Sequence, residues 1–241
     1  MDSYVNFGCS VIGPGHIKTG KPNQDSFLIK KYKKGWVVVV SDGVGSKSLS
    51  HIGSAAVCNS VSNVMRDYLN SSQNIDMKDV LRLVHSRWLF EISPCLADDC
   101  CATVLFAVVS PQKIILGRLG DGMICCRNNH EDILLLDDKT DSFSNITKCM
   151  RFKFSYDDWY IKEIPLENFE YVFLSSDGVS DDIRPDVQTL FVRDLVTEYS
   201  IENSRIRTKK IKRMLLNWPV PMHSDDKTIA CLVNRGDKQI G

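Results

Sequence analysis

Five short acidic clusters, spread along the chain, carry the residues best suited to chemistry. Two of them, Asp42-Gly43 and Asp177-Gly178, come just after the strongly apolar runs 36–40 and 171–174. Such runs are typical of buried strands, and a carboxylate at the end of a buried strand is held rigidly. Several strand ends gathered in one place would form an oxygen-rich site for hard divalent cations. The clusters are Asn23-Gln24-Asp25, Asp42-Gly43, Gly120-Asp121-Gly122, Asp177-Gly178 with Asp181, and Asp225-Asp226.

Each cluster taken alone has a simpler interpretation, because Asp-Gly is also a common dipeptide of hairpin turns. For Gly120-Asp121-Gly122, which lies between two expected strands, a turn and a metal site both remain open. For Asp225-Asp226 a solvated turn remains open. Asp42 and Asp177 fit a turn less well, because each precedes a helical or polar segment and does not join two closely spaced strands.

The spacing of apolar side chains predicts the elements that position these clusters. Alternation predicts a strand over 5–11, and the runs 26–30 and 36–40 predict a hairpin. Apolar residues at helical spacing predict helices over 57–68, 80–92, 185–199 and 205–218. Further strands are expected over 102–109, 113–119, 123–127, 132–136, 171–176 and 228–233. Strands and helices fall in separate runs, which favours an α+β layered domain with antiparallel sheets.

Length and charge narrow the class of protein. The 241 residues are enough for one substantial core and few for two full domains, so we expect a single domain over 1–241. Its least regular stretch, 137–168, is expected to be a flap-like excursion over a sheet edge. Lysine and arginine number 30, as do aspartate and glutamate, which argues against a nucleic-acid or membrane partner. The basic segment 205–213 is interpreted as the solvated face of an amphipathic helix, with a phosphate-binding patch as the alternative.

The nine cysteines favour reduced thiols in a cytoplasmic protein. Their number is odd, no Cys-x-x-Cys is present, and most lie in apolar runs, where a free cysteine behaves as a small hydrophobic residue. A thiolate zinc site at Cys95, Cys100 and Cys101 has no second pair at zinc-finger spacing to support it. The N-terminal residues have neither the basic nor the apolar region of a signal peptide.

The combination and order of the motifs is more informative than any one of them. Over about 11–233 it resembles the metal-dependent serine/threonine protein phosphatases, the PPM or type 2C family. The segment from Gly15-His16 to Asp25 is most similar to a compact bacterial branch of that family. The matching features are Asn23-Gln24-Asp25, Asp42-Gly43 after an apolar strand, Cys101-Ala102-Thr103, Gly120-Asp121-Gly122, Asp177-Gly178 with Asp181, and Asp225-Asp226 before a strand.

The resemblance implies a four-layer αββα sandwich of two antiparallel sheets flanked by helices. Two Mg²⁺ or Mn²⁺ ions would lie at one end of it, with Asp42 bridging both. The Gly43 carbonyl would bind one ion, and Asp177 and Asp225 would hold the other. Asp121 and Asp181 match a weaker third metal position.

The resemblance also implies supporting residues around the metal ions. Asp25 and Gln24 are expected to support the site from the preceding segment. The arginine by which the family contacts phosphate has no counterpart upstream of Asn23, so we expect Lys21 or Lys18 in its place.

The implied activity is hydrolysis of phosphoserine and phosphothreonine in proteins by a water that bridges two divalent cations. The substrates would be phosphorylated proteins, such as the products of a serine/threonine kinase, and the enzyme is expected to be a monomer. Two alternatives remain: a catalytically weak phosphatase-like module with a regulatory or binding role, and a phosphoesterase for small molecules.

Overall fold

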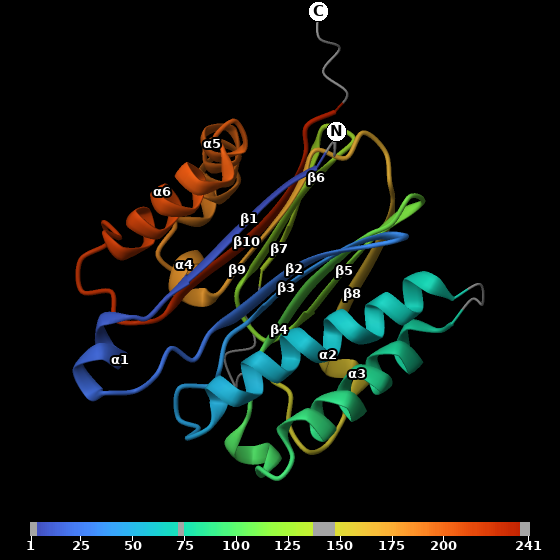
Figure 1. Ribbon diagram of the computed structural model, residues 1–241, viewed down its shortest axis with the longest axis vertical. Coiled ribbons are helices and arrows are strands. Elements are labelled where there is room, and N and C mark those ends of the chain that lie inside the picture. Colours follow the sequence, from blue (N-terminus) through green and yellow to red (C-terminus); the bar gives the residue numbers. More distant parts are fainter. Residues whose placement is uncertain (1–3, 72–74, 137–147, 237–241) are drawn as a thin grey trace, which may run out of the picture.

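Two five-stranded antiparallel sheets pack face to face in the computed structural model, which describes residues 4–71, 75–136 and 148–236 (Figure 1). The first sheet has the order β1 (Tyr4–Val11), β10 (Lys227–Asn234), β9 (Tyr171–Ser175), β6 (Met123–Asn128) and β7 (Glu131–Leu135). The second has the order β2 (Ser26–Tyr32), β3 (Gly35–Ser41), β4 (Val104–Val109), β5 (Lys113–Leu119) and β8 (Tyr160–Pro165).

Helices cover the outer face of each sheet (Figure 1). Helices α2 (Ser50–Asn70) and α3 (Met77–Ile92) lie on the second sheet, and α5 (Gln188–Ser200) and α6 (Ser204–Leu216) lie on the first. The predicted four-layer αββα sandwich is therefore confirmed. The shorter elements are α1 (Pro14–Thr19), α4 (Asp177–Ser180) and the 3₁₀ turns η1 (Ala97–Asp99), η2 (Tyr156–Asp158) and η3 (Pro185–Val187).

Strand β3 shows why its apolar run is continuous. Val37 and Val39 pack toward α2 and α3, whereas Val38 and Val40 pack toward the other sheet. Successive side chains of a strand point to opposite faces, so a strand covered on both sides must be apolar at every position. The third hydrophobic layer lies between the first sheet and helices α5 and α6.

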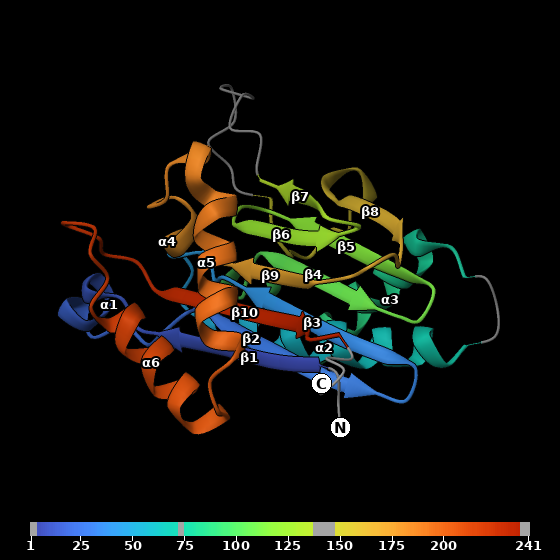
Figure 2. The ribbon, with the colours of Figure 1, turned by 90° about the horizontal axis from the view of Figure 1, so that it is seen from above.

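Antiparallel pairing brings the ends of distant strands to one end of the sandwich. Ser41, the last residue of β3, pairs with Ser26, the first of β2. Ser175, the last residue of β9, pairs with both Ile229 of β10 and Met123 of β6. The acidic clusters that precede or follow these strands are thereby gathered, and both views place α1 and α4 at this same end (Figures 1 and 2).

Helix α1 and strand β8 are among the elements that were not predicted from the sequence. Helix α1 buries none of its residues, so it has no apolar stripe to detect. Strand β8 falls within 137–168 and pairs with β5 at the edge of the second sheet. Residues 137–147 of the expected flap lie outside the described residues, and the flap stays a prediction.

Helix α6 contains the basic segment 205–213 and has the predicted amphipathic character. Ile211 and Leu215 are buried, whereas most of its basic side chains are exposed. Arg207 is the buried exception, with its guanidinium 5.9 Å from the centre of the Phe7 ring. None of the helices within the described ranges combines the length and the apolar character that a membrane crossing requires.

Close backbone contact between α2 and the segment before β4 generates a stability prediction. A Cβ atom on Gly53 would lie 1.8 Å from the carbonyl oxygen of Cys100, so Gly53→Ala must push α2 away from that segment. Overpacking of this kind typically costs about 1–3 kcal/mol, more than the ~1 kcal/mol that alanine gains over glycine within a helix. We expect a lower free energy of unfolding in urea. Asn59→Ala, on the exposed side of α2, is the control; equal stability of the two variants would contradict the contact.

Candidate metal centre

Asp42 is held by its backbone at the end of β3. Its N–H donates to Thr103 Oγ1 at 3.0 Å, and its carbonyl accepts from the Thr103 N–H at 2.8 Å. The preceding Ser41 hydroxyl donates to the Thr103 carbonyl at 2.6 Å. Gly43 pairs with Ala102 in an isolated antiparallel bridge. The segment 101–103 therefore fixes the loop that carries Asp42 and Gly43.

Asp25 and Asp177 lie on either side of Asp42. Asp25 precedes β2, and its Oδ2 accepts from the Ser176 hydroxyl at 2.7 Å. Asp177 follows Ser176 and begins α4. Each of the two carboxyl groups is within hydrogen-bonding reach of the Asp42 carboxyl. Strand ends from both sheets thus bring three acidic side chains together.

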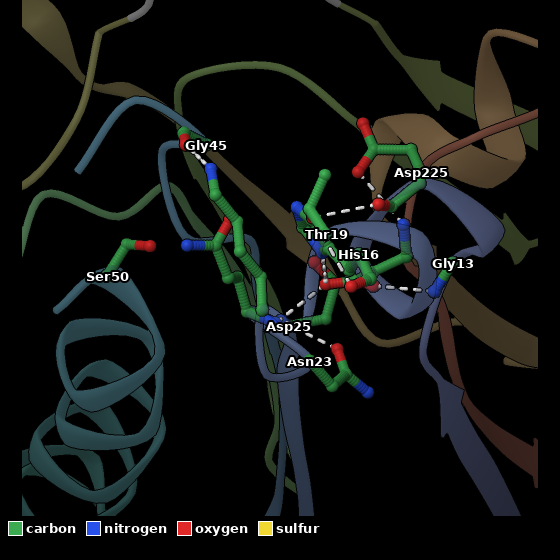
Figure 3. A network of polar contacts seen from close by, with 12 residues as sticks. Gly13, His16, Thr19, Asn23, Asp25, Gly45, Ser50 and Asp225 are labelled. Carbon is green, nitrogen blue, oxygen red and sulfur yellow. Dashed lines mark hydrogen bonds and ion pairs between the residues drawn. The ribbon is translucent and has the colours of Figure 1, made fainter. Parts of the chain in front are cut away.

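The neighbours Asp225 and Asp226, which precede β10, have different surroundings (Figure 3). Asp226 is buried, and its Oδ1 accepts from the Gly13 N–H at 2.7 Å. Its Oδ2 accepts from the Gln24 N–H at 2.6 Å and lies 2.9 Å from His16 Nδ1. Asp226 is therefore a structural group that joins the backbone at Gly13 and at Gln24 to the segment before β10. Asp225 is exposed, and its Oδ1 accepts from the Asp226 N–H at 2.9 Å.

A cavity of about 120 Å³ collects most of the predicted metal ligands. Its lining includes Asp42, Gly43, Asp121, Asp177 and Asp225, together with Thr103 and the Val44-Gly45 loop. The predicted third-site residue Asp181 lines an adjacent cavity of about 240 Å³, which shares Asp177 and Asp225. At Gly120-Asp121-Gly122 both glycines have a positive φ, which fits the expected turn, and Asp121 also lines the cavity.

Burial and mutual repulsion disfavour the charged forms of these carboxyl groups. Burial raises the pKa of Asp42 well above its usual range, and the charges of Asp25 and Asp177 raise it further. Burial raises the pKa of Asp25 to about 7, against the lowering effect of the Ser176 hydroxyl. Burial also raises the pKa of Asp177 to about 6, with contributions from Asp121, Asp225 and Asp181. A proton or a cation is needed to relieve this repulsion.

The donor set fits a hard divalent cation. It consists of carboxylate oxygens and the backbone of Gly43, the ligands that Mg²⁺ and Mn²⁺ prefer. The buried Oδ1 atoms of Asp25 and Asp177 receive no N–H or hydroxyl donor within the described residues, so they are free to bind a cation. In the same ranges no three Asp, Glu, His or Cys side chains are already gathered closely enough to hold one. Binding therefore requires the side chains lining the cavity to reorient.

The two lysines predicted to contact phosphate differ in position. Lys21 Nζ donates to the Gly45 carbonyl at 2.9 Å, which brings its charge to the loop that lines the cavity (Figure 3). Lys18 lies on the exposed side of α1. Neither lysine lines the cavity itself, but Lys21 binds a loop residue that does, and no such contact is found for Lys18 among the described residues.

Gln24 is buried next to the same loop. Its carbonyl accepts from the Gly43 N–H at 3.1 Å, and its Nε2 donates to the Lys47 carbonyl at 3.4 Å. Its Oε1 is buried and finds no donor among the described groups. Gln24 does not line the cavity, so it supports the Asp42–Gly43 loop from behind.

The role of the groups that position the acidic side chains could not be recognised from the sequence. Thr103 fixes the backbone of Asp42, Ser176 binds Asp25, and Asp226 with His16 fixes the segment that leads to Gln24. Thr103 occurs in a motif quoted above and Ser176 directly precedes another, but their types and spacing do not reveal their partners. The signal for Asp226 was its place beside Asp225, which does not distinguish a ligand from a structural acid.

Comparisons with known proteins place the chain among phosphatases. The family model described as Protein phosphatase 2C matches residues 12–216, a range that contains Asp42, Asp121 and Asp177 but not Asp225. A search of curated proteins gave no match.

Solved structures of similar fold come from bacterial phosphatases at low sequence identity. A bacterial serine phosphatase is 15% identical with a TM-score of 0.65, and the match covers 97% of this chain and 98% of that one. Serine/threonine phosphatase Stp1 from Staphylococcus aureus is 15% identical with a TM-score of 0.65, covering 96% and 95%. The catalytic domain of phosphatase PstP, in complex with two manganese ions, is 14% identical with a TM-score of 0.64, covering 95% and 97%.

The raised pKa values generate a prediction about the metal-free protein. Asp42→Asn removes a buried charge whose ionisation opposes folding, so in EDTA at pH 8 the variant should resist urea better than the wild type. The pKa of Asp25 is about 7, so below that pH the wild-type carboxyl groups take up protons. The difference in stability between the variant and the wild type should then shrink. It should be smallest near pH 4, close to the usual pKa of about 3.9 for an aspartate in an unfolded chain.

Asp186→Asn is the control, because the Asp186 side chain is 68% exposed. A metal-free Asp42→Asn variant that is less stable than the wild type at pH 8 would contradict the electrostatic description.

Proposed function

The chain belongs to the protein phosphatase 2C family, and on that premise we propose that the cavity at the end of the sandwich is its active site. The protein is a metal-dependent protein serine/threonine phosphatase. One observation carries the assignment of the site: Asp42, Asp121, Asp177 and Asp225, from four separate parts of the chain, line one cavity. Carboxylates gathered this closely repel one another and destabilise the folded state, so a domain with only a structural role would not need them.

The residues have separate roles in this proposal. Asp42 and the Gly43 carbonyl would hold one divalent cation, Asp177 and Asp225 would hold a second, and Asp42 would contribute to both. Asp121 and Asp181 serve a third, weaker position. When bound, Mg²⁺ or Mn²⁺ supplies an activated water and neutralises phosphate charge. Thr103 and Asp25 keep the Asp42 carboxyl in place, and Lys21 attracts the phosphate group at the cavity rim.

The proposed substrates are proteins phosphorylated on serine or threonine, such as the products of a serine/threonine kinase. The open rim beside Gly45 and Lys21 suits a phosphorylated side chain that projects from a protein surface. We propose that the enzyme works as a monomer in the cytoplasm. Retention of all the predicted cavity-lining carboxylates favours turnover over a purely regulatory or binding role.

Metal dependence and the ranking of ligands test the function. Hydrolysis of p-nitrophenyl phosphate and of a phosphothreonine peptide should require Mn²⁺ or Mg²⁺ and disappear in EDTA.

Asp42→Asn should lower kcat by about 100-fold or more, because it removes the charge shared by both ions. Asp121→Asn should have a smaller effect, because it serves a weaker position.

Asp186→Asn is the matched surface control, with circular dichroism to verify the fold of each variant. Full turnover by metal-stripped protein would refute the mechanism, and equal losses for Asp121→Asn and Asp42→Asn would refute the assigned roles.

Lys21 and Lys18 form a natural pair for testing the phosphate contact. A lysine contributes one compact charge without a planar fork, so it should assist binding more than it orients the reacting groups. Lys21→Ala should raise KM by about fivefold, the equivalent of ~1 kcal/mol, and change kcat little. Lys18→Ala should leave both constants unchanged. If KM is the same in both variants, another group holds the phosphate.

A further inference from the structure

Four of the free cysteines lie together beside the Asp42–Gly43 loop and have no part in the proposed function. Cys95 contacts Cys100, and Cys101 contacts Cys149. Across the described ranges no three such groups are arranged to hold a metal ion, so the thiols form two pairs and not a metal site.

The pairing of Cys101 with Cys149 follows from the backbone. Ala102 and Met150 form an isolated antiparallel bridge, in which the Met150 N–H donates to the Ala102 carbonyl at 2.8 Å. Cys101 and Cys149 flank this bridge as diagonal neighbours on one face, where the two thiols interact with each other. Cys101 is 5% exposed, whereas Cys149 is half-buried and offers access from solvent.

Both segments also contact the loops that carry proposed metal ligands. The Cys101 carbonyl accepts from the Val44 N–H at 3.0 Å, and the adjacent Ala102 pairs with Gly43. On the other side, the carbonyl oxygen of Lys148 lies 2.4 Å from where a Cβ atom on Gly120 would stand. A movement of Cys101 therefore displaces the loop of Asp42, and a movement of Cys149 displaces the loop of Asp121.

We propose that Cys101 and Cys149 form a reversible disulfide, driven by a hydroperoxide, that lowers phosphatase activity by displacing the loops of Asp42 and Asp121. The effect on activity rests on the proposed function, whereas formation of the bond does not. A disulfide bond is about 2 Å long, much shorter than a contact between two thiols. Closing it brings the two sulfur atoms nearer together and pulls on both segments, and a shift of about 1 Å near reacting groups can cost about 100-fold in rate.

The chemistry balances with hydrogen peroxide as the oxidant. The Cys101 thiolate attacks one peroxide oxygen, the O–O bond breaks, and a sulfenic acid and hydroxide form. The Cys149 sulfur then attacks the sulfenic sulfur, the S–S bond forms, the S–O bond breaks, and the departing hydroxide leaves as water with the Cys149 proton. The two thiols lose two electrons, which the peroxide gains.

Electrostatics favour Cys101 over Cys100 as the thiol that reacts first, whereas the pKa of Cys149 is raised by its contact with Cys101 and by burial. The hydrogen bond from Cys149 lowers the pKa of the Cys101 thiol; Lys47 and Arg151 lower it further, against the effect of burial. Burial, with Cys95 alongside, raises the pKa of Cys100 to about 11. Since the thiolate is the reactive form, Cys101 is the more easily oxidised of the two buried thiols.

The test treats the full-length protein with hydrogen peroxide in the presence of Mg²⁺, removes the peroxide with catalase, and divides the sample. One half is alkylated, digested with trypsin without reduction and examined by mass spectrometry. Cleavage after Lys148 and Arg151 isolates Cys149 as the single cysteine of a three-residue peptide, so its partner is identified directly. Fragmentation between Cys100 and Cys101 then distinguishes these neighbours. The other half is assayed for phosphatase activity before and after dithiothreitol.

We expect a Cys101–Cys149 linkage and a loss of activity of at least about tenfold, with recovery in dithiothreitol. Cys95→Ala, which removes the thiol of the competing pair, should behave like the wild type, whereas Cys149→Ala should show neither the linkage nor the reversible loss. The proposal is overturned by the absence of the linkage, by a Cys95–Cys100 linkage in its place, or by linkage without loss of activity. An untreated protein without activity would instead refute the proposed function, since the peptide mapping does not depend on turnover.

Discussion

The crowding of carboxyl groups at one end of the sandwich is the constraint on which the rest of the structure depends. Asp25 is buried and Asp42 and Asp177 are half-buried, all within reach of one another, and desolvation and repulsion raise the pKa of each. A flexible chain would relieve this repulsion by moving apart. Here the backbone cannot move freely, because Thr103 bonds Asp42 from both sides and Ser176 binds Asp25. The folded protein therefore keeps this repulsion, and a bound divalent cation would relieve it.

The sheets supply the rigidity that this arrangement needs. Strand β3 is buried on both faces, with alternate valines packed against helices and against the opposite sheet. The Trp88 indole N–H donates to the Gly53 carbonyl at 3.1 Å, which joins α3 to α2 where α2 meets the segment before β4. That segment continues into Cys101, Ala102 and Thr103, the residues that hold the Asp42–Gly43 loop. Packing of the outer helices and geometry of the cavity are thus connected through one short stretch of chain.

Neighbouring residues of the same type have different roles because their surroundings differ. Asp225 is exposed and lines the cavity, whereas Asp226 is buried and accepts hydrogen bonds from Gly13 and Gln24. Cys100 and Cys101 are likewise adjacent, yet their pKa values shift in opposite directions because one is dominated by burial and the other by a partner thiol. In both pairs the tertiary contacts, and not the residue type, separate the structural member from the one to which a function is proposed.

The sequence alone determined the α+β class, the strands on which the acidic clusters sit, and the order of motifs that identifies the family. Continuous apolar runs and Asp-Gly at strand ends are local signals, and they predicted that Asp42 and Asp177 would be rigidly held. Helix α1 and strand β8 escaped prediction because neither carries a strong local pattern: α1 buries no residue, and β8 is an edge strand whose residues are all half-buried or exposed. Only the tertiary structure decided which residues meet, since Asp25 and Ser176, or Cys101 and Cys149, are far apart in the chain. It also separated Asp225 from Asp226 and Lys21 from Lys18, because strand register and loop contacts, which no local spacing encodes, set the distance of each side chain from the cavity.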